Sequence, residues 1–305
     1  MPEFYHYLLS FGVLGGISAS MLFNPSVSAI GHWFNRRRGL ATGIACTAGG
    51  IGGCIFPLMI LYLAPSIGFP WAVRAVGFVC AFFCALACIL TRKRLPPNKH
   101  AGAGVDFRAL REPRFSATTA AVFLIEFAVF IPYTYISSYA VHMGMDSHRA
   151  YLLNVLLNAG AVPGRALPGY AADRLGIFNV MVITAGTCTV FVLGLWLPIS
   201  TLNEPAINAF AVLFGFWSGA AISLTPVCIG QVCRTEDYGK RNGTSFSIAS
   251  IGALIGIPLA GVVLRAQNGS YWALIVLAGA VYASAMVMFA VVRIMVTGWK
   301  LTAKF

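Results

Sequence analysis

The sequence predicts an all-α integral membrane protein that crosses the bilayer about nine times. Hydrophobic residues make up 58% of the 305 positions, charged residues only 10%, and the mean hydropathy is +0.79. Soluble domains carry about 25% charged residues, far more than this chain. The apolar residues also recur along the whole sequence in runs of roughly twenty, which is the length of a helix that crosses the hydrocarbon core.

Nine apolar segments are long enough to form transmembrane helices. They are expected near residues 9–33, 41–64, 71–91, 115–140, 150–171, 177–199, 206–231, 243–265 and 271–296. We predict helices because a segment in lipid must pair its own backbone groups, and because the alternating pattern of barrel strands is absent.

The basic residues lie in short clusters between the apolar segments. One side of the predicted bundle holds Arg36, Arg37 and Arg38 and the segments 92–114, 234–241 and 293–304, and also Arg174. Since cytoplasmic loops are enriched in Lys and Arg, we expect this side in the cytoplasm, the N-terminus outside and the C-terminus inside. The same pattern accounts for the net charge of +12 and excludes nucleic acid as the partner.

The longest polar stretch, residues 92–114, contains Pro96 and Pro97 and is expected to be a cytoplasmic linker. It separates an incomplete N-terminal bundle of three spans, residues 1–91, from a C-terminal bundle of six spans, residues 115–305. The eight cysteines lack the spacing of a metal site, so neither a metal nor a cofactor is expected.

An internal repeat relates the two predicted bundles. The pattern Gly-x-x-x-Gly-x-x-x-Ser occurs at 12–20 and again at 215–223, and Pro25 is matched by Pro226 at a similar offset. Parallel repeats of six spans build the major facilitator architecture. The second copy follows three spans and the first follows none, so three opening helices are expected to be missing. The alternative is a chance likeness between glycine-rich helices.

Four stretches give the sequence a specific family resemblance. Residues 33–45 read WFNRRRGLATGIA, 135–139 read YISSY, 164–176 read GRALPGYAADRLG, and 224–226 read LTP. In these stretches the chain resembles the monocarboxylate porter family of the major facilitator superfamily, particularly its fungal branch. The resemblance implies a transporter fold built from two helical halves. The family's opening helix has no counterpart here, and Ile177 replaces a basic residue that is typical of the family.

Arg165 is the principal candidate for substrate binding. It lies inside the fifth predicted span, where a permanent charge is costly unless it faces water or a counter-ion. A guanidinium binds carboxylates through two parallel hydrogen bonds, so an organic anion is the expected ligand. The resemblance agrees, because family members carry a transport-associated arginine here. The alternatives are a structural ion pair and a side chain that extends toward the interface.

Glu126 is the candidate coupling residue, because it is the acidic residue buried within an apolar run. Animal members of the family have an aspartate four residues before the arginine, where this chain has Ala161, so the family's proton coupling is not implied directly. Glu126 either pairs with Arg165, carries a proton or has a structural role. Asn158 and Tyr135 are further candidates for the substrate cavity, with helix contacts as their alternative role.

The turn at Asp173 and Arg174 resembles the short cytoplasmic gate motif of the superfamily, in which the acidic residue contacts a neighbouring helix end. Arg37 and Arg38, in the other basic turn, are assigned to the same gate. The alternative is a charged turn without a gating role.

These features favour a secondary transporter of small organic anions that works by alternating access in the plasma membrane. Monocarboxylates are the expected substrate class. The expected partners of the transporter are the lipid bilayer and a small organic anion, with a proton as the expected co-substrate. No H-E-x-x-H, G-x-S-x-G or phosphate-binding loop motif indicates an enzyme. The alternative is a membrane protein that does not transport, either a truncated product or a receptor-like sensor.

Overall fold

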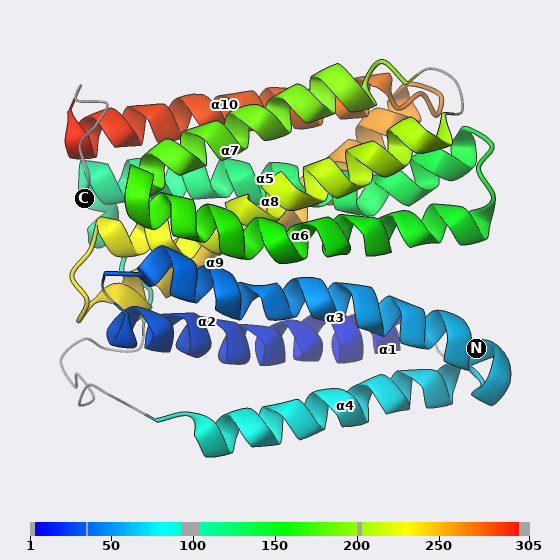
Figure 1. Ribbon diagram of the computed structural model, residues 1–305, viewed down its shortest axis with the longest axis horizontal. Helices are drawn as coiled ribbons and strands as arrows, with labels where there is room; N and C mark the ends of the chain where they lie inside the picture. The colour runs from blue at the N-terminus through cyan, green and yellow to red at the C-terminus, as the bar shows by residue number, and fades with distance from the viewer. Residues whose placement is uncertain (1–3, 35, 93–103, 200–202, 299–305) are drawn as a thin grey trace.

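A computed structural model describes residues 4–34, 36–92, 104–199 and 203–298, and within these ranges every regular element is helical (Figure 1). The first segment joins α1 (Phe4–Tyr7), a π-helical stretch (Leu8–Leu14) and α2 (Gly15–Trp33). The remaining helices are α3 (Arg38–Ile67), α4 (Phe69–Leu90), α5 (Pro113–His142), α6 (Ser147–Leu175), α7 (Ile177–Phe191), α8 (Glu204–Gln231), α9 (Tyr238–Ala266) and α10 (Trp272–Thr297), with a 3-10 turn at Ala109–Arg111 and a π-helical turn at Val192–Trp196.

The all-helical membrane fold predicted from the sequence is confirmed. Eight helical segments of the described residues are long and apolar enough to cross a membrane. The remaining predicted span, residues 150–171, corresponds to α6, which is a continuous helix of 29 residues but is less apolar. Its lower hydropathy has a clear cause, because it carries Asn154, Asn158 and Arg165 inside and Asp173 and Arg174 near its end. These polar groups are compatible with a span only where neighbouring helices cover them.

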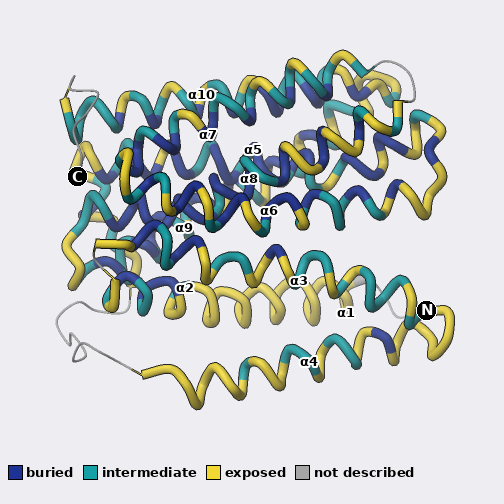
Figure 2. The backbone as a smooth tube through the Cα atoms, in the orientation of Figure 1, coloured by how far each residue is buried: buried dark blue, intermediate teal, exposed yellow. Residues whose placement is uncertain are grey.

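Helix α6 is the central element of the packing. It contacts α3 on one side and α8 on the other, while α5 packs against α9 and α10, and α7 against α10 and α8 (Figure 1). Aromatic rings fill the interior beside α8, where Phe210 stacks on Trp196 and on Phe214 with centroid distances of 5.2 and 5.3 Å. The most deeply buried backbone therefore lies among α5 to α8 (Figure 2).

Helix α4 and the first turns of α2 expose nearly all of their apolar side chains (Figure 2). Phe78, Phe82 and Ile89 of α4 are 69%, 66% and 78% exposed. In a bilayer such a face contacts lipid tails or other helices rather than water, so its exposure is compatible with a membrane protein.

The connections α2–α3, α6–α7 and α8–α9 and the described parts of the α4–α5 connection all lie at the same end of the bundle (Figure 1). This end, which holds Arg36–Arg38, Arg174 and residues 234–241, is called the basic end below. It is the end that the charge pattern predicts to face the cytoplasm. Residues 93–103, Asn35, Lys300 and Lys304 lie outside the described residues, so the linker prediction is described only in part.

Candidate functional site

The contact between α3 and α6 forms a seam that runs between the two predicted bundles. The two helices are antiparallel and meet backbone to backbone, because glycines on α3 face α6. A side chain at Gly43 would overlap the carbonyl oxygen of Arg165, and one at Gly39 would lie 2.6 Å from the carbonyl oxygen of Gly169. Small residues permit this close approach of helices in membranes. We call this contact the α3–α6 seam.

Arg165 projects from α6 across the α3–α6 seam. Arg165 is only 8% exposed, and its Nη1 donates a hydrogen bond of 2.6 Å to the carbonyl oxygen of Cys46 in α3. A side chain at Gly49 would overlap Nη1, so the glycine provides the space for the guanidinium. The ion pairs among the described residues do not include Arg165. The guanidinium therefore keeps a buried positive charge whose protein partner is a neutral carbonyl.

Glu126 lies on α5 and is 8% exposed. Within the described part of the chain its carboxyl group has neither a hydrogen-bond partner nor an ion pair, so the expected pairing with Arg165 is not formed. A buried carboxylate without a partner is expensive, and such a group is a candidate for proton binding. The structure thus leaves Arg165 and Glu126 as two separate buried ionisable groups.

The structure brings Asn158, but not Tyr135, close to the seam. Asn158 lies two turns before Arg165 on the same face of α6, and a side chain at Gly53 of α3 would overlap its amide. Its Nδ2 donates to the carbonyl oxygen of Asn154 at 2.8 Å. The Tyr135 hydroxyl instead donates to the carbonyl oxygen of Ile257 at 2.9 Å, which joins α5 to α9.

Asp173 lies at the basic end of the seam, against the first turn of α3. Its two carboxylate oxygens accept hydrogen bonds from the backbone N–H groups of Gly39 and Leu40 at 2.8 and 2.9 Å. These N–H groups have no partner within α3, and the N-terminus of a helix attracts negative charge. Asp173 therefore caps a helix from the other side of the seam.

Arg38 joins three further helices at the basic end. The residue is 7% exposed, and it donates to the carbonyl oxygen of Gly230 in α8 at 3.0 Å and to that of Gly31 in α2 at 3.1 Å. Its guanidinium also lies over the Tyr238 ring of α9, 4.3 Å from the centroid. The geometry separates Arg38 from its neighbour Arg37, which is exposed.

Arg174 is also exposed, and its guanidinium lies over the ring of Tyr170 at 4.5 Å within the same helix. It makes no contact across the seam among the described interactions. Of the four residues assigned to a gate from the sequence, Asp173 and Arg38 therefore connect different helices, whereas Arg174 and Arg37 face outward.

Sequence reasoning missed two contacts between helices at the basic end. Asn242 of α9 donates to the side-chain oxygen of Asn24 in α2 at 2.8 Å. The Tyr238 hydroxyl donates to the carbonyl oxygen of Pro226 at 3.0 Å, which holds the ring beneath Arg38. Polar side chains inside apolar runs were the available signal, because such groups rarely stay unpaired in a span.

A groove of about 690 Å³ lies between α2 and α9 near these contacts. Its polar lining includes the hydroxyl groups of Ser20, Thr244, Ser247 and Ser250 and the amide of Asn24, together with the side chains of His32, Glu236 and Lys240. The rings of Phe23 and Phe246 meet edge to face in its wall, with centroids 5.3 Å apart. This size is sufficient for a small organic molecule.

A polytopic helical bundle with buried charged groups at a helix seam is compatible with a membrane transport protein. The chain belongs to the Major Facilitator Superfamily, whose sequence pattern it matches over residues 1–240. It is a transporter of this superfamily, and the family comprises transport proteins rather than enzymes.

Curated relatives agree with this membership, and a solved structure shares the fold. An "MFS-type transporter" of Gibberella moniliformis is 36% identical over 303 residues, which are 99% of this chain and 72% of that protein. The riboflavin transporter MCH5 of Saccharomyces cerevisiae is 32% identical over 289 residues, covering 87% of this chain and 55% of that protein. The crystal structure of a bacterial homologue of the iron transporter ferroportin superposes on this chain with a TM-score of 0.69, covering 92% of this chain and 71% of that protein. The two sequences are 14% identical, so this likeness supports the fold alone.

Proposed function

We propose that this transporter carries small organic anions through the α3–α6 seam and that Arg165 binds the anion. Monocarboxylates are the substrate class that we propose. One observation carries the proposal. The Arg165 guanidinium is buried at the middle of the seam, and its described protein partner is the Cys46 carbonyl rather than a carboxylate. A permanent charge in a span is expensive and marks a functional site by default. A substrate carboxylate that replaces the carbonyl would supply the missing negative charge.

We propose that transport occurs by alternating access, with the basic end closed in this conformation. The supporting contacts are those of Asp173 with the first turn of α3 and those of Arg38 with α8 and α9. Both contacts join the predicted N-terminal and C-terminal bundles, so both must break before the basic end can open. Domain rocking of this kind exchanges one set of interface contacts for another.

Glu126 is proposed as the proton-binding group that couples transport to a proton gradient. Its support is burial on α5 without a described partner, because a buried charge without a partner is costly. The plasma membrane as location and the membership of the monocarboxylate porter branch stay predictions from the sequence.

A neutral, larger organic substrate is the second candidate. It is favoured by the groove between α2 and α9, whose lining offers hydroxyl and amide groups beside two aromatic rings. The resemblance to a riboflavin transporter points in the same direction, since riboflavin is a polar aromatic compound. In this case substrate selection depends on hydrogen bonds in the groove and not on Arg165.

Uptake into proteoliposomes tests the two candidates against each other. The purified chain, its Arg165→Gln variant and an Arg174→Gln control are reconstituted and given a labelled monocarboxylate or labelled riboflavin. The first proposal expects monocarboxylate uptake that Arg165→Gln abolishes and Arg174→Gln preserves. Riboflavin uptake that survives Arg165→Gln supports the second candidate, and a complete lack of uptake supports the non-transporting alternative.

A further inference from the structure

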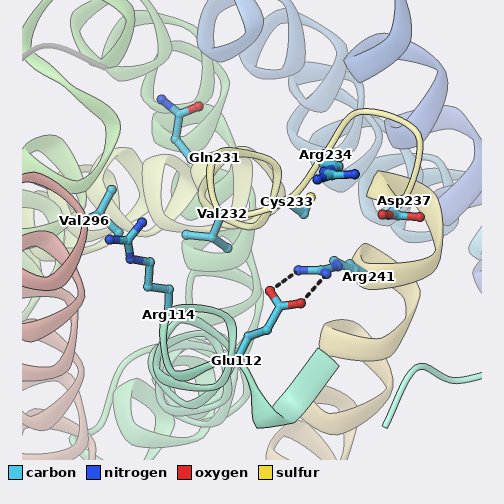
Figure 3. Close-up of a pocket in the computed structure, with 9 residues that line it drawn as sticks. All are labelled: Glu112, Arg114, Gln231, Val232, Cys233, Arg234, Asp237, Arg241 and Val296. Atoms are coloured by element: carbon cyan, nitrogen blue, oxygen red, sulfur yellow. Dashed lines mark hydrogen bonds and ion pairs between the residues drawn. The ribbon is translucent and has the colours of Figure 1, made fainter. Parts of the chain in front are cut away.

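A second polar cavity lies at the basic end, away from the α3–α6 seam (Figure 3). Its volume is about 530 Å³. The start of α5, the end of α8, the α8–α9 connection, the first turn of α9 and the end of α10 enclose it. The residues that line it are Glu112, Arg114, Gln231, Val232, Cys233, Arg234, Asp237, Arg241 and Val296.

One arginine of this cavity is already held in place. Arg241 makes two hydrogen bonds of 2.6 Å with the carboxylate of Glu112, and its guanidinium lies 5.4 Å from the centroid of the Phe115 ring. The paired hydrogen bonds fix the guanidinium, whose side chain is only 14% exposed. Since the two charges cancel, this pair forms part of the wall and leaves the other charged residues to determine the potential.

The other two arginines are not paired in this way. Arg114 and Arg234 are exposed, and neither forms an ion pair among the described residues. In Figure 3 they approach the cavity from different sides, Arg114 from α5 and Arg234 from the α8–α9 connection. The lining holds three arginines against two acidic residues, Glu112 and Asp237, which leaves one net positive charge.

Two helix N-termini add to the positive potential. Glu112 is the residue before α5 and Asp237 the residue before α9, so both helices begin at the cavity wall. These helices are long, at 30 and 29 residues, and their first turns carry N–H groups without partners in the helix. The thiol of Cys233 adds no negative charge, because burial raises its pKa to about 11.

From the cavity, its two unpaired arginines and the two helix N-termini, we propose that this site binds a phosphate group at the cytoplasmic face. Arginine forks and helix N-termini are the usual ligands of phosphate in proteins. The phosphate belongs either to the headgroup of an anionic lipid or to a soluble phosphorylated compound. Basic pockets between helices on the cytoplasmic side bind lipid headgroups in other membrane proteins.

Occupancy of this site would connect helices that this structure joins only in part. A phosphate bound by both arginines bridges α5 to the α8–α9 connection, next to Tyr238 and Arg38. These elements all belong to the C-terminal side of the chain, and the site is separate from Arg165, so a bound phosphate would not occupy the substrate-binding group.

Binding of the purified 305-residue chain to two probes tests the proposal. The first probe is inorganic phosphate, titrated into the protein in detergent at low salt. The second is a phosphatidylinositol phosphate in phosphatidylcholine nanodiscs, compared with nanodiscs of phosphatidylcholine alone. Binding in the first arm assigns a soluble phosphate, and binding only in the second assigns a lipid headgroup.

Three variants in the cavity and one control outside it make the test specific. Arg114→Gln and Arg234→Gln are each expected to weaken binding at least about tenfold, because each removes charge-assisted hydrogen bonds. Arg234→Lys keeps the charge and should recover part of the affinity. Arg149→Gln is the matched control, because Arg149 lies at the opposite end of the bundle in an exposed ion pair with Glu204 at 3.1 Å.

Circular dichroism and gel filtration establish that each variant is folded before binding is compared. Absence of binding in both arms overturns the proposal. Equal affinities of the folded wild type, Arg114→Gln and Arg234→Gln overturn it as well. A loss that Arg149→Gln reproduces would indicate a general effect of charge and would also contradict a built site.

Discussion

Replacing Asp173 with asparagine should open the basic end. The carboxylate accepts hydrogen bonds of 2.8 and 2.9 Å from two backbone N–H groups of α3, and asparagine keeps one oxygen acceptor but no charge. A hydrogen bond to a charged group is worth about 1.5–3 kcal/mol, and the interaction with the helix terminus adds about 0.3–1 kcal/mol. Because Asp173 is half-buried, we take the lower bound of about 1.5 kcal/mol for the loss.

This free energy converts into a change in population. If the contact exists only in the closed arrangement, the loss of about 1.5 kcal/mol raises the ratio of open to closed molecules slightly more than tenfold, because about 1.4 kcal/mol corresponds to a factor of ten. Spin labels at positions 37 and 174 measure that ratio, because both residues are exposed and flank the contact. Pulsed dipolar spectroscopy in nanodiscs should show a longer distance gaining population in Asp173→Asn.

Asp146→Asn is the matched control for this prediction. Asp146 also accepts hydrogen bonds from the first turn of a helix, from the N–H groups of His148 and Arg149 at 3.0 and 3.3 Å, but that helix is its own. Its loss should therefore leave the label distances unchanged. An unchanged distance distribution in Asp173→Asn, or an equal shift in both variants, would refute the assignment of Asp173 to the closed state.

Three further predictions concern stability in detergent, measured by thermal unfolding. Gly43→Ala should destabilise the protein by about 1–3 kcal/mol, because its methyl group would overlap backbone across the seam. Gly16→Ala should be tolerated, because open space surrounds Gly16. Equal effects of the two variants would contradict the packing. Arg38→Lys should lower the unfolding midpoint, since it loses the fork that reaches two helices, while Arg37→Lys should not; a lower midpoint in both would contradict the distinction. The hydrogen bonds from Arg241 lower the pKa of the Glu112 carboxyl group. Wild type should therefore be more stable than Glu112→Gln above the normal pKa of a glutamate, and this difference in stability should vanish as the pH falls through the lowered pKa. A difference that grows as the pH falls would contradict the pairing.

The fold was predictable from the sequence because a transmembrane helix can be recognised from the length and hydropathy of its own segment. The boundaries of α5 and α10 lie close to the predicted segments, since a helix in lipid satisfies its backbone bonds locally. Only α6 departs from the simple criterion of apolar length. Its polar residues are covered by α3 and α8, and such coverage depends on neighbours that a local pattern does not contain.

The candidate site was less accessible to sequence reasoning, because its details depend on contacts between distant helices. The sequence singles out Arg165 as a charge in a span, but its partner at Cys46 is a backbone carbonyl that no side-chain pattern identifies. Arg37 and Arg38 are indistinguishable in sequence, and the burial of Arg38 follows from where α3 begins and from the space beside Gly230.

Equilibrium binding of a labelled monocarboxylate to the purified chain tests whether Arg165 binds the substrate anion. We expect saturable binding that Arg165→Gln weakens at least about tenfold, because the charged two-pronged contact is lost, and that Arg174→Gln leaves unchanged. Equal affinity of the wild type and a folded Arg165→Gln variant would contradict it.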